Sequence, residues 1–232
     1  MHLPRLLTPE FNSLPSVFLA NQRARGNSDF DVFLHRAAFL FVSNHMHKVA
    51  GVSLIHRHER IDQGEMMLQQ LENWRGHEAL VCRKVPARTC DNSVPVNLLR
   101  TSACWVGVEF SRSPRAFDKL GKLISNSGFM EQYERLIAEF NLQYQVGLSI
   151  YTRDEFSDER LDLLPLEVTL KSEAANIITL VDPAMSDQTI STNWFFHEQL
   201  DTGCQVVCAY RCFDRSPGHS KEHAGTIHGI VA

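Results

Sequence analysis

The order of helix-like and strand-like segments is the feature that most restricts the possible folds of this chain. A pair of helices is predicted near the middle, at 113–127 and 130–140, because Ser113-Pro114 is a typical helix start and apolar residues then repeat at helical spacing. An earlier helix is predicted over about 28–48. The strand-like segments are 51–58, 65–71, 79–84, 98–110, 146–152, 166–171, 176–181 and 203–213. Grouped helices and consecutive strands predict an α+β fold: a largely antiparallel sheet with an N-terminal helix and a central helical pair.

The length of the chain and the absence of a linker-like segment predict one domain. The 232 residues are 44% hydrophobic, and no Ser/Gly/Pro-rich stretch divides them. Prolines at positions 4, 9 and 15 predict an extended N-terminal arm over 1–27. Residues 214–232, which carry three histidines, are expected to form a C-terminal tail.

Charge and cysteine content argue against several classes of partner. The 23 basic and 27 acidic residues give a net charge of −4, and the basic residues are scattered, so a nucleic-acid partner is not predicted. The longest apolar stretch, 37–42, is too short to cross a bilayer, and the N-terminus lacks the apolar core of a signal peptide. Six cysteines without an export signal indicate a reducing environment, so we expect a cytoplasmic protein.

Two histidines at alternate positions are the first candidate site. In a strand over 51–58, His56 and His58 lie on one face with Cα atoms about 6.5–7 Å apart, so their rings can converge on one ion. A turn at 62–64 would return the chain as a hairpin over 65–71, which adds the carboxylate of Glu65. Three interpretations remain open: metal ligands, acid–base groups, or structural residues whose rings bond backbone carbonyls.

The tail offers a second pair of histidines. Ser216-Pro217 can start a short helix that ends at Gly225, and His219 and His223 then share one face at i and i+4. If the tail folds back onto the strand that carries His56 and His58, the four histidines form a composite site for a divalent metal, zinc or iron. The alternative is a solvated tail.

Other conspicuous residues are assigned to the core. Cys204, Cys208 and Cys212 are spaced four apart in a predicted strand, and residues at that spacing are about 13 Å apart, too far for one zinc ion. The cysteines are therefore expected to form part of an apolar face, and the alternative is that a histidine beside one of them makes it a ligand or the nucleophile of an enzyme. Aromatic residues at 105 and 194–196 are expected to pack in the core. At the end of the first long helix, the helical stripe predicts a packed His45 and an exposed His47.

The segment Leu54-Ile55-His56-Arg57-His58, followed by Gly64-Glu65-Met66-Met67-Leu68, resembles uncharacterised fungal proteins. These carry an LxHRHF…GE pattern after a helix and often end in a Cys/His-bearing tail. The present chain has Glu59 where that pattern has an aromatic residue. The resemblance implies an accessory protein of fungal specialised metabolism.

The sequence thus predicts a small-molecule enzyme without a nucleotide cofactor, since it contains neither GxGxxG nor a P-loop. The predicted catalytic residues are His56, His58 and Glu65, and the chemistry is acid–base or metal-assisted, of the lyase, isomerase, cyclase or hydrolase type. The predicted metal ligands are His56, His58, His219 and His223. The alternative is a non-catalytic protein that binds a partner or a metal. The oligomeric state is not predicted.

Overall fold

The computed structural model describes residues 3–158, 163–170, 173–182, 189–196 and, for the backbone, 206–213. The helices are α1 (Thr8–Ser13), α2 (Val17–Arg25), α3 (Phe30–Ser43), α4 (Pro114–Ser125) and α5 (Ser127–Glu139). The strands are β1 (Ala50–Leu54), β2 (Glu65–Trp74), β3 (His77–Pro86), β4 (Val94–Arg100), β5 (Trp105–Ser111), β6 (Val146–Ile150), β7 (Leu164–Leu170), β8 (Ala175–Val181), β9 (Ile190–Phe196) and β10 (Val206–Phe213).

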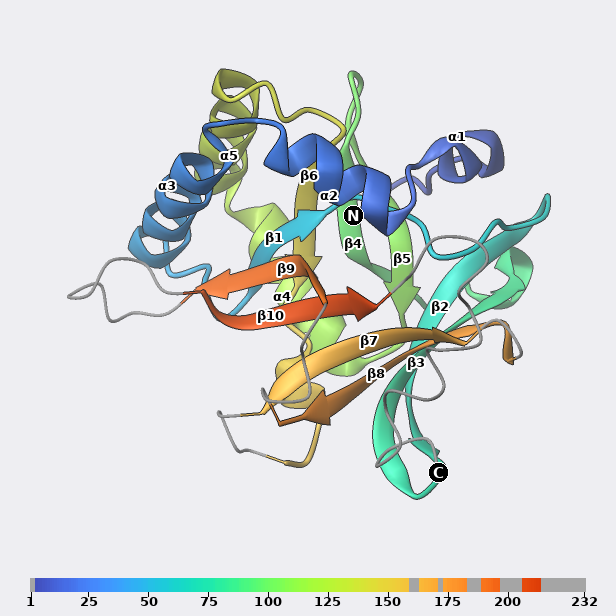
Figure 1. Ribbon diagram of the computed structural model, residues 1–232. Coiled ribbons are helices and arrows are strands. Elements are labelled where there is room, and N and C mark those ends of the chain that lie inside the picture. The colour runs from blue at the N-terminus through green and yellow to red at the C-terminus, as the bar shows by residue number, and fades with distance from the viewer. Residues whose placement is uncertain (1–2, 159–162, 171–172, 183–188, 197–205, 214–232) are drawn as a thin grey trace.

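The strands form one closed barrel (Figure 1). Their order around it is β1-β6-β4-β5-β2-β3-β8-β7-β10-β9, and β9 pairs with β1 to close the ring. Two neighbouring pairs, β2 with β5 and β7 with β10, are parallel, and the other pairs are antiparallel. The predicted α+β class with a largely antiparallel sheet is therefore confirmed.

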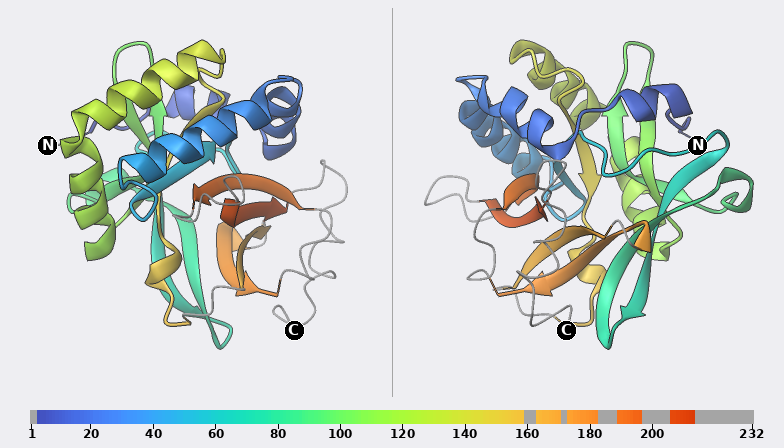
Figure 2. Two further views of the ribbon diagram at one scale, coloured as in Figure 1. Left: turned by 90° about the vertical axis from the view of Figure 1, so that its left-hand side faces the viewer. Right: turned by 45° about the vertical axis from the view of Figure 1, so that its right-hand side comes forward.

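Four of the five described helices, α2 to α5, pack on one part of the barrel. Figures 1 and 2 show α3 and α5 side by side on one flank of the molecule, with α1 on the opposite flank. The largest core cluster joins residues of α2, α3, α4 and α5 to the faces of β1, β4, β6 and β9. At its centre Phe41 packs edge-on against Phe129 and Tyr133, and the Tyr133 hydroxyl donates a hydrogen bond to the Gly147 carbonyl, 2.9 Å away. No helix among the described residues is long and apolar enough to span a membrane.

The central helical pair matches the prediction loosely, because the first helix starts after the predicted Ser113 cap but the second begins at Ser127 rather than at 130. The Ser113 hydroxyl accepts hydrogen bonds from the backbone of Arg115 and Ala116, as an N-cap does. The break between the helices is at Asn126 rather than at Gly128, because the Asn126 side chain caps the second helix.

The predicted extended arm over 1–27 is wrong. It contains α1 and α2, whose starts tolerate the prolines: Pro9 lies in the first turn of α1 and Pro15 precedes the Ser16 cap of α2. The amide hydrogen that Pro9 lacks would have no partner in a first turn anyway, and Pro15 lies outside α2, so neither proline breaks a helix.

The predicted hairpin between 51–58 and 65–71 is also wrong. β1 pairs with β6 and β9, whereas β2 forms a ten-pair ladder with β3. The turn between β2 and β3 consists of Arg75 and Gly76, both at positive φ, which is the geometry that two-residue hairpins favour. Gly76 is the residue in the sequence that favours this hairpin turn. The Asp62-Gln63-Gly64 turn is a weaker turn signal and only leads the chain into β2.

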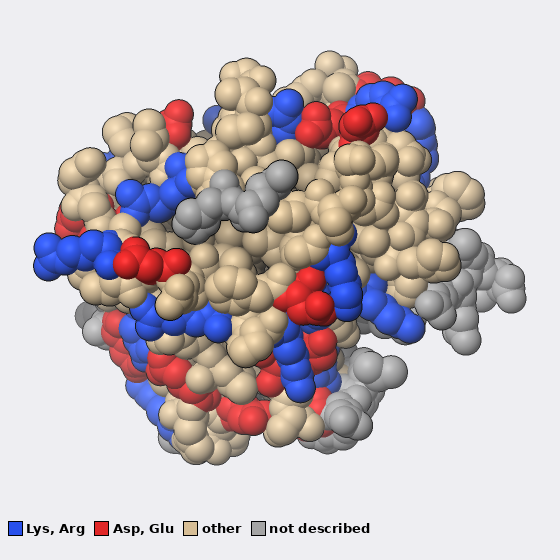
Figure 3. Space-filling model, turned by 180° about the vertical axis from the view of Figure 1, so that it is seen from behind, with Lys and Arg blue, Asp and Glu red and all other residues tan. Residues whose placement is uncertain are grey.

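Surface charges of both signs are mixed. On the face shown in Figure 3, the basic and acidic side chains lie interspersed. Several form exposed pairs, such as Arg25 with Asp31 and Lys122 with Asp118. Pairs of this kind contribute little to stability because water screens them.

The barrel wall requires a glycine where strands approach closely. A Cβ atom on Gly147 in β6 would lie 2.0 Å from the Leu98 carbonyl oxygen of β4. We therefore expect Gly147→Ala to lower the free energy of unfolding by about 3 kcal/mol, since the backbone must move apart. Urea unfolding measures the change.

The matched control is Gly121→Ala in α4, where a Cβ meets no atom within 4 Å. Alanine has the higher helix propensity, so this variant should be more stable by about 0.5–1 kcal/mol. Equal effects of the two substitutions would contradict the close approach of β6 to β4.

Candidate active site

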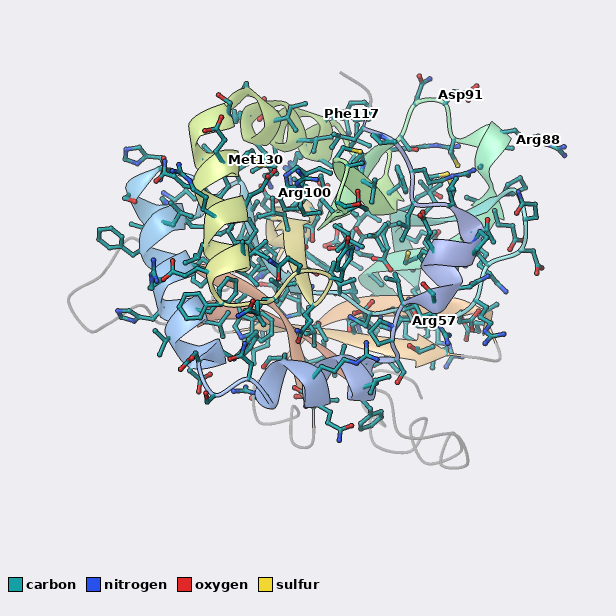
Figure 4. The ribbon with its side chains drawn as sticks, turned by 90° about the horizontal axis from the view of Figure 1, so that it is seen from above. Arg57, Arg88, Asp91, Arg100, Phe117 and Met130 are labelled. Atoms are coloured by element: carbon teal, nitrogen blue, oxygen red, sulfur yellow. The ribbon has the colours of Figure 1, made fainter. Side chains whose placement is uncertain are left out.

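The segment after β1 carries the two histidines into the barrel. β1 ends at Leu54, so His56 and His58 lie beyond the strand in which they were predicted. Arg57, between them, is anchored on the other side: its backbone amide donates to the Pro15 carbonyl and its Nε to the Leu14 carbonyl, both 2.9 Å away. Figure 4 shows Arg57 beside the N-terminal helices. The alternation of side chains expected of a strand persists without the strand.

His56, His58 and Glu167 of β7 converge on one point. The Nε2 atoms of the two histidines are 3.0 Å apart, and His58 Nε2 is 3.1 Å from Glu167 Oε1. One ligand atom from each residue lies within 4.8 Å of the other two, which makes these residues a cluster that could hold a metal ion. The side chains of His58 and Glu167 are only 4% and 7% exposed.

The outer nitrogens of both rings are also bonded. His56 Nδ1 donates to the Leu54 carbonyl, 2.7 Å away, so the lone pair of this ring is on Nε2 and faces His58. His58 Nδ1 lies 2.9 Å from Thr169 Oγ1 of β7. Metal-binding histidines typically have their second nitrogen bonded in this way, which fixes the orientation of the ring.

The electrostatics of the cluster set the charge of two of its members, His56 and Glu167. Burial, together with the neighbouring charge of His58, lowers the pKa of His56 to about 4, so this ring is neutral at pH 7. Burial raises the pKa of Glu167, but the attraction and hydrogen bond of His58 outweigh it, and the net pKa is below the usual value. The cluster therefore offers a neutral imidazole and an ionised carboxylate.

Glu109 of β5 lies across the same interior. Asn97 Nδ2 of β4 donates to its Oε2 at 2.7 Å. Burial, and then the charge of Glu167, raise the pKa of Glu109 to about 7. A carboxyl group with that pKa exchanges protons near neutral pH, as an acid–base catalyst must.

Two small cavities, each of about 20 Å³, adjoin these residues. Both are lined by Asn97, Glu109, Glu167 and Asn193. The first is also lined by Ser53, Leu54, Ile55, His56, His58 and Val108, and the second by Gln69, Val96, Ser149, Thr152 and Ile178. Each volume corresponds to roughly one water molecule or one ion.

The register of the strands explains why the interior is polar. Asn97 pairs with both Ser149 and Glu109, Asn193 pairs with Ser53, and these residues share one layer. The sequence reasoning missed Glu109, Glu167, Asn97 and Asn193. The available signal was a single carboxylate inside an otherwise apolar strand, in Trp105–Ser111 and again in Leu164–Leu170.

Glu65 does not occupy the place predicted for it. It begins β2, where its carboxylate accepts a hydrogen bond from the Asp62 amide, 2.8 Å away, and it lines neither cavity. The physical reason is that β1 and β2 do not form a hairpin. Glu167, from a strand more than 100 residues later in the chain, is the carboxylate beside the histidines.

The remaining candidates have mixed outcomes. Trp105 and the aromatic residues 194–196 are buried, as predicted. His47 is buried and His45 is exposed, the reverse of the prediction, because α3 ends at Ser43 and His45 has a φ of 57°, which ends the helical stripe.

The histidines predicted in the C-terminal tail lie outside the residues that the structure describes. His219, His223 and Cys204 belong to residues outside the described ranges, and of Cys208 and Cys212 only the backbone, in β10, is described. The composite site therefore stays a prediction. Comparisons with protein-family models, curated proteins and solved structures find no match to this chain.

The raised pKa of Glu109 predicts a pH-dependent stability of the metal-free protein. The unfolded chain releases this proton near the ordinary pKa of 4.5, whereas the folded protein retains it up to about pH 7. Stability is therefore lost as the pH rises from 4.5 through 7, by up to about 3 kcal/mol. His56 acts oppositely, since its lowered pKa costs stability as the pH falls from 6.5 towards 4.

Glu109→Gln isolates the first effect. The free energy of unfolding of this variant, minus that of the wild type, should increase between pH 4.5 and 7.5 in urea titrations. Glu131→Gln on the exposed face of α5 controls for loss of a carboxylate. A difference that does not change with pH would show that Glu109 ionises normally.

Proposed function

We propose that the protein is an enzyme that performs metal-assisted acid–base chemistry on a small organic molecule, with His56, His58 and Glu167 as ligands of a divalent ion. The observation that carries this proposal is the convergence of these three side chains beside the buried carboxyl group of Glu109, which lines the same cavity. The reaction class is elimination, isomerisation, cyclisation or hydrolysis, and it needs no nucleotide cofactor.

The spacing of the ligand atoms supports one shared ion. Ligand atoms about 2.1 Å from a metal are about 3.0 Å apart at right angles and about 3.4 Å apart in a tetrahedron. The two separations at His58 Nε2, 3.0 and 3.1 Å, are those of a hydrogen bond and an ion pair, and they also fall within the range that ligands of one ion require. Two histidines and one carboxylate are a set used for iron in six-coordinate sites, and also for zinc.

The role of each residue follows from its position. The ligands would fix the ion, which polarises a bound oxygen and lowers the pKa of bound water. Glu109 would accept or donate the proton that the reaction moves, and Asn97 orients that carboxylate. Asn193, which lines both cavities, would bond a polar group of the substrate.

The size of the cavities favours a second candidate, a metal-binding protein without catalytic activity. Spaces of about 20 Å³ accept an ion or a water molecule, whereas an organic substrate would have to displace lining side chains. The two candidates share the metal site and differ in turnover.

Metal binding is tested on untagged full-length protein that is stripped and then reloaded with iron(II) under argon, or with zinc. We expect at least one tightly bound ion per chain by elemental analysis. His58→Ala should weaken binding by at least about 100-fold, because a ligand is lost rather than a surrounding group. His45→Ala, on the exposed side of the α3 terminus, should bind as the wild type does. A wild-type protein that retains no ion would refute the metal site.

The tail histidines need a separate variant. A His219→Ala/His223→Ala double substitution that weakens binding would support the composite site, and unchanged binding would limit the ligands to the barrel.

Turnover distinguishes the two candidates. The metal-loaded protein is incubated with a mixture of small metabolites, and consumed compounds are identified by mass spectrometry. An enzyme should deplete a compound that neither His58→Ala nor Glu109→Gln depletes. Equal profiles for all three proteins would favour the non-catalytic candidate.

A further inference from the structure

We propose that Glu109 and Glu167, with the side-chain oxygens of Asn97 and Asn193, bind a second cation, a hard ion such as Mg²⁺ or Mn²⁺. Glu167 would then bridge two cations, the first of which is held by His56 and His58. This inference rests on the proposed metal site and extends it to a centre of two ions, in which Glu109 and Asn193 are ligands in place of the proton-transfer and substrate-binding roles that the one-ion site gives them.

The side-chain oxygens of the two asparagines are the first observation. Asn97 donates its Nδ2 to Glu109, so its Oδ1 must point elsewhere. That oxygen is buried and has no hydrogen-bond partner among the described residues, and the same holds for Oδ1 of Asn193, a residue only 8% exposed. A buried acceptor left without a donor costs about 1–3 kcal/mol, so two of them on one cavity wall require an explanation.

The lining of the cavities is the second observation. Both cavities share the two carboxylates and the two amides, but only the first touches the histidines. The second adds Gln69, Ser149 and Thr152, so its polar lining consists of amide, hydroxyl and carboxylate groups. Oxygen ligands of this type favour Mg²⁺, Mn²⁺ or Ca²⁺ over softer metals.

Charge balance is the third observation. Glu167 is paired with His58, whereas Glu109 forms no ion pair within the described part of the chain. The two carboxylates line one cavity and repel each other when both are ionised, and a divalent cation between them would turn that repulsion into attraction. Paired metal ions in proteins are typically about 3.5–4 Å apart, a separation that one bridging carboxylate spans.

The test counts ions in the full-length protein. The stripped protein is loaded with one equivalent of Zn²⁺ and then titrated with Mn²⁺, whose binding is followed by electron paramagnetic resonance and calorimetry. We expect one further Mn²⁺ to bind. With Mn²⁺ in place of Zn²⁺, two equivalents should give the exchange-coupled spectrum of neighbouring ions, which surface sites do not produce.

Two variants shift the second site in opposite directions. Glu109→Gln can keep the hydrogen bond from Asn97, so the fold is retained. The substitution should lower the affinity for the second ion by at least about 10-fold and leave the first ion bound. Asn193→Asp adds a negatively charged ligand and should raise the affinity for the second ion by at least about 10-fold. If Asn193 has only a structural role, Asn193→Asp should not raise the affinity for the second ion.

The outcomes separate this inference from the proposed function. One tightly bound ion in the wild type, with no second and no exchange coupling, would overturn the second site and leave the first. No tightly bound ion at all would overturn both. A second ion that binds equally well to Glu109→Gln would place it elsewhere and would also overturn this inference.

Discussion

Closure of the barrel is the constraint on which the rest of the structure depends. Every second residue of a strand in a closed sheet points inwards. A polar group on such a residue must find its hydrogen-bond partners among the other inward residues or in a water molecule, ion or ligand inside the barrel. Here the inward layer holds two glutamates, several asparagines and serines and, from the segment after β1, two histidines. The apolar core lies mainly between the helices and the outer faces of β1, β4, β6 and β9.

Burial of these polar groups costs free energy when the protein folds. Asn176, fully buried in β8, has no hydrogen-bond partner for its side chain among the described residues, and the open oxygens of Asn97 and Asn193 add to that cost. A ligand that binds only the folded state stabilises it in proportion to the logarithm of ligand concentration over Kd. An ion that satisfies these groups would therefore stabilise the fold as well as supply chemistry.

The sequence could predict what depends on neighbouring residues. The central helices are marked by a cap, a proline and helical spacing, and the pair His56 and His58 stands out because alternation within three residues survives loss of the strand. Long-range pairing could not be predicted. β1 pairs with strands about 100 and 140 residues later, and no local pattern specifies those partners.

The assignment of Glu65 as the carboxylate beside the histidines was wrong for the same reason, since it depended on which strands pair. Glu65 is close to the histidines in sequence, and the hairpin hypothesis brought it close in space, but Gly76 directs β2 to pair with β3. Glu167 and Glu109 were visible as isolated acids in apolar strands. Only the barrel shows that they share one interior with His56 and His58.

The ladders around the barrel are unequal in length. β2 and β3 share ten residue pairs, whereas β1 with β9 and β4 with β6 share two each. Asn193 stands in the first of these short ladders and Asn97 in the second, so both flank the cavities. The wall is thus held by the fewest backbone bonds beside its polar contents. Helix packing therefore does in these two places what strand pairing does elsewhere in the ring, since the main apolar core covers the same four strands, β1, β4, β6 and β9.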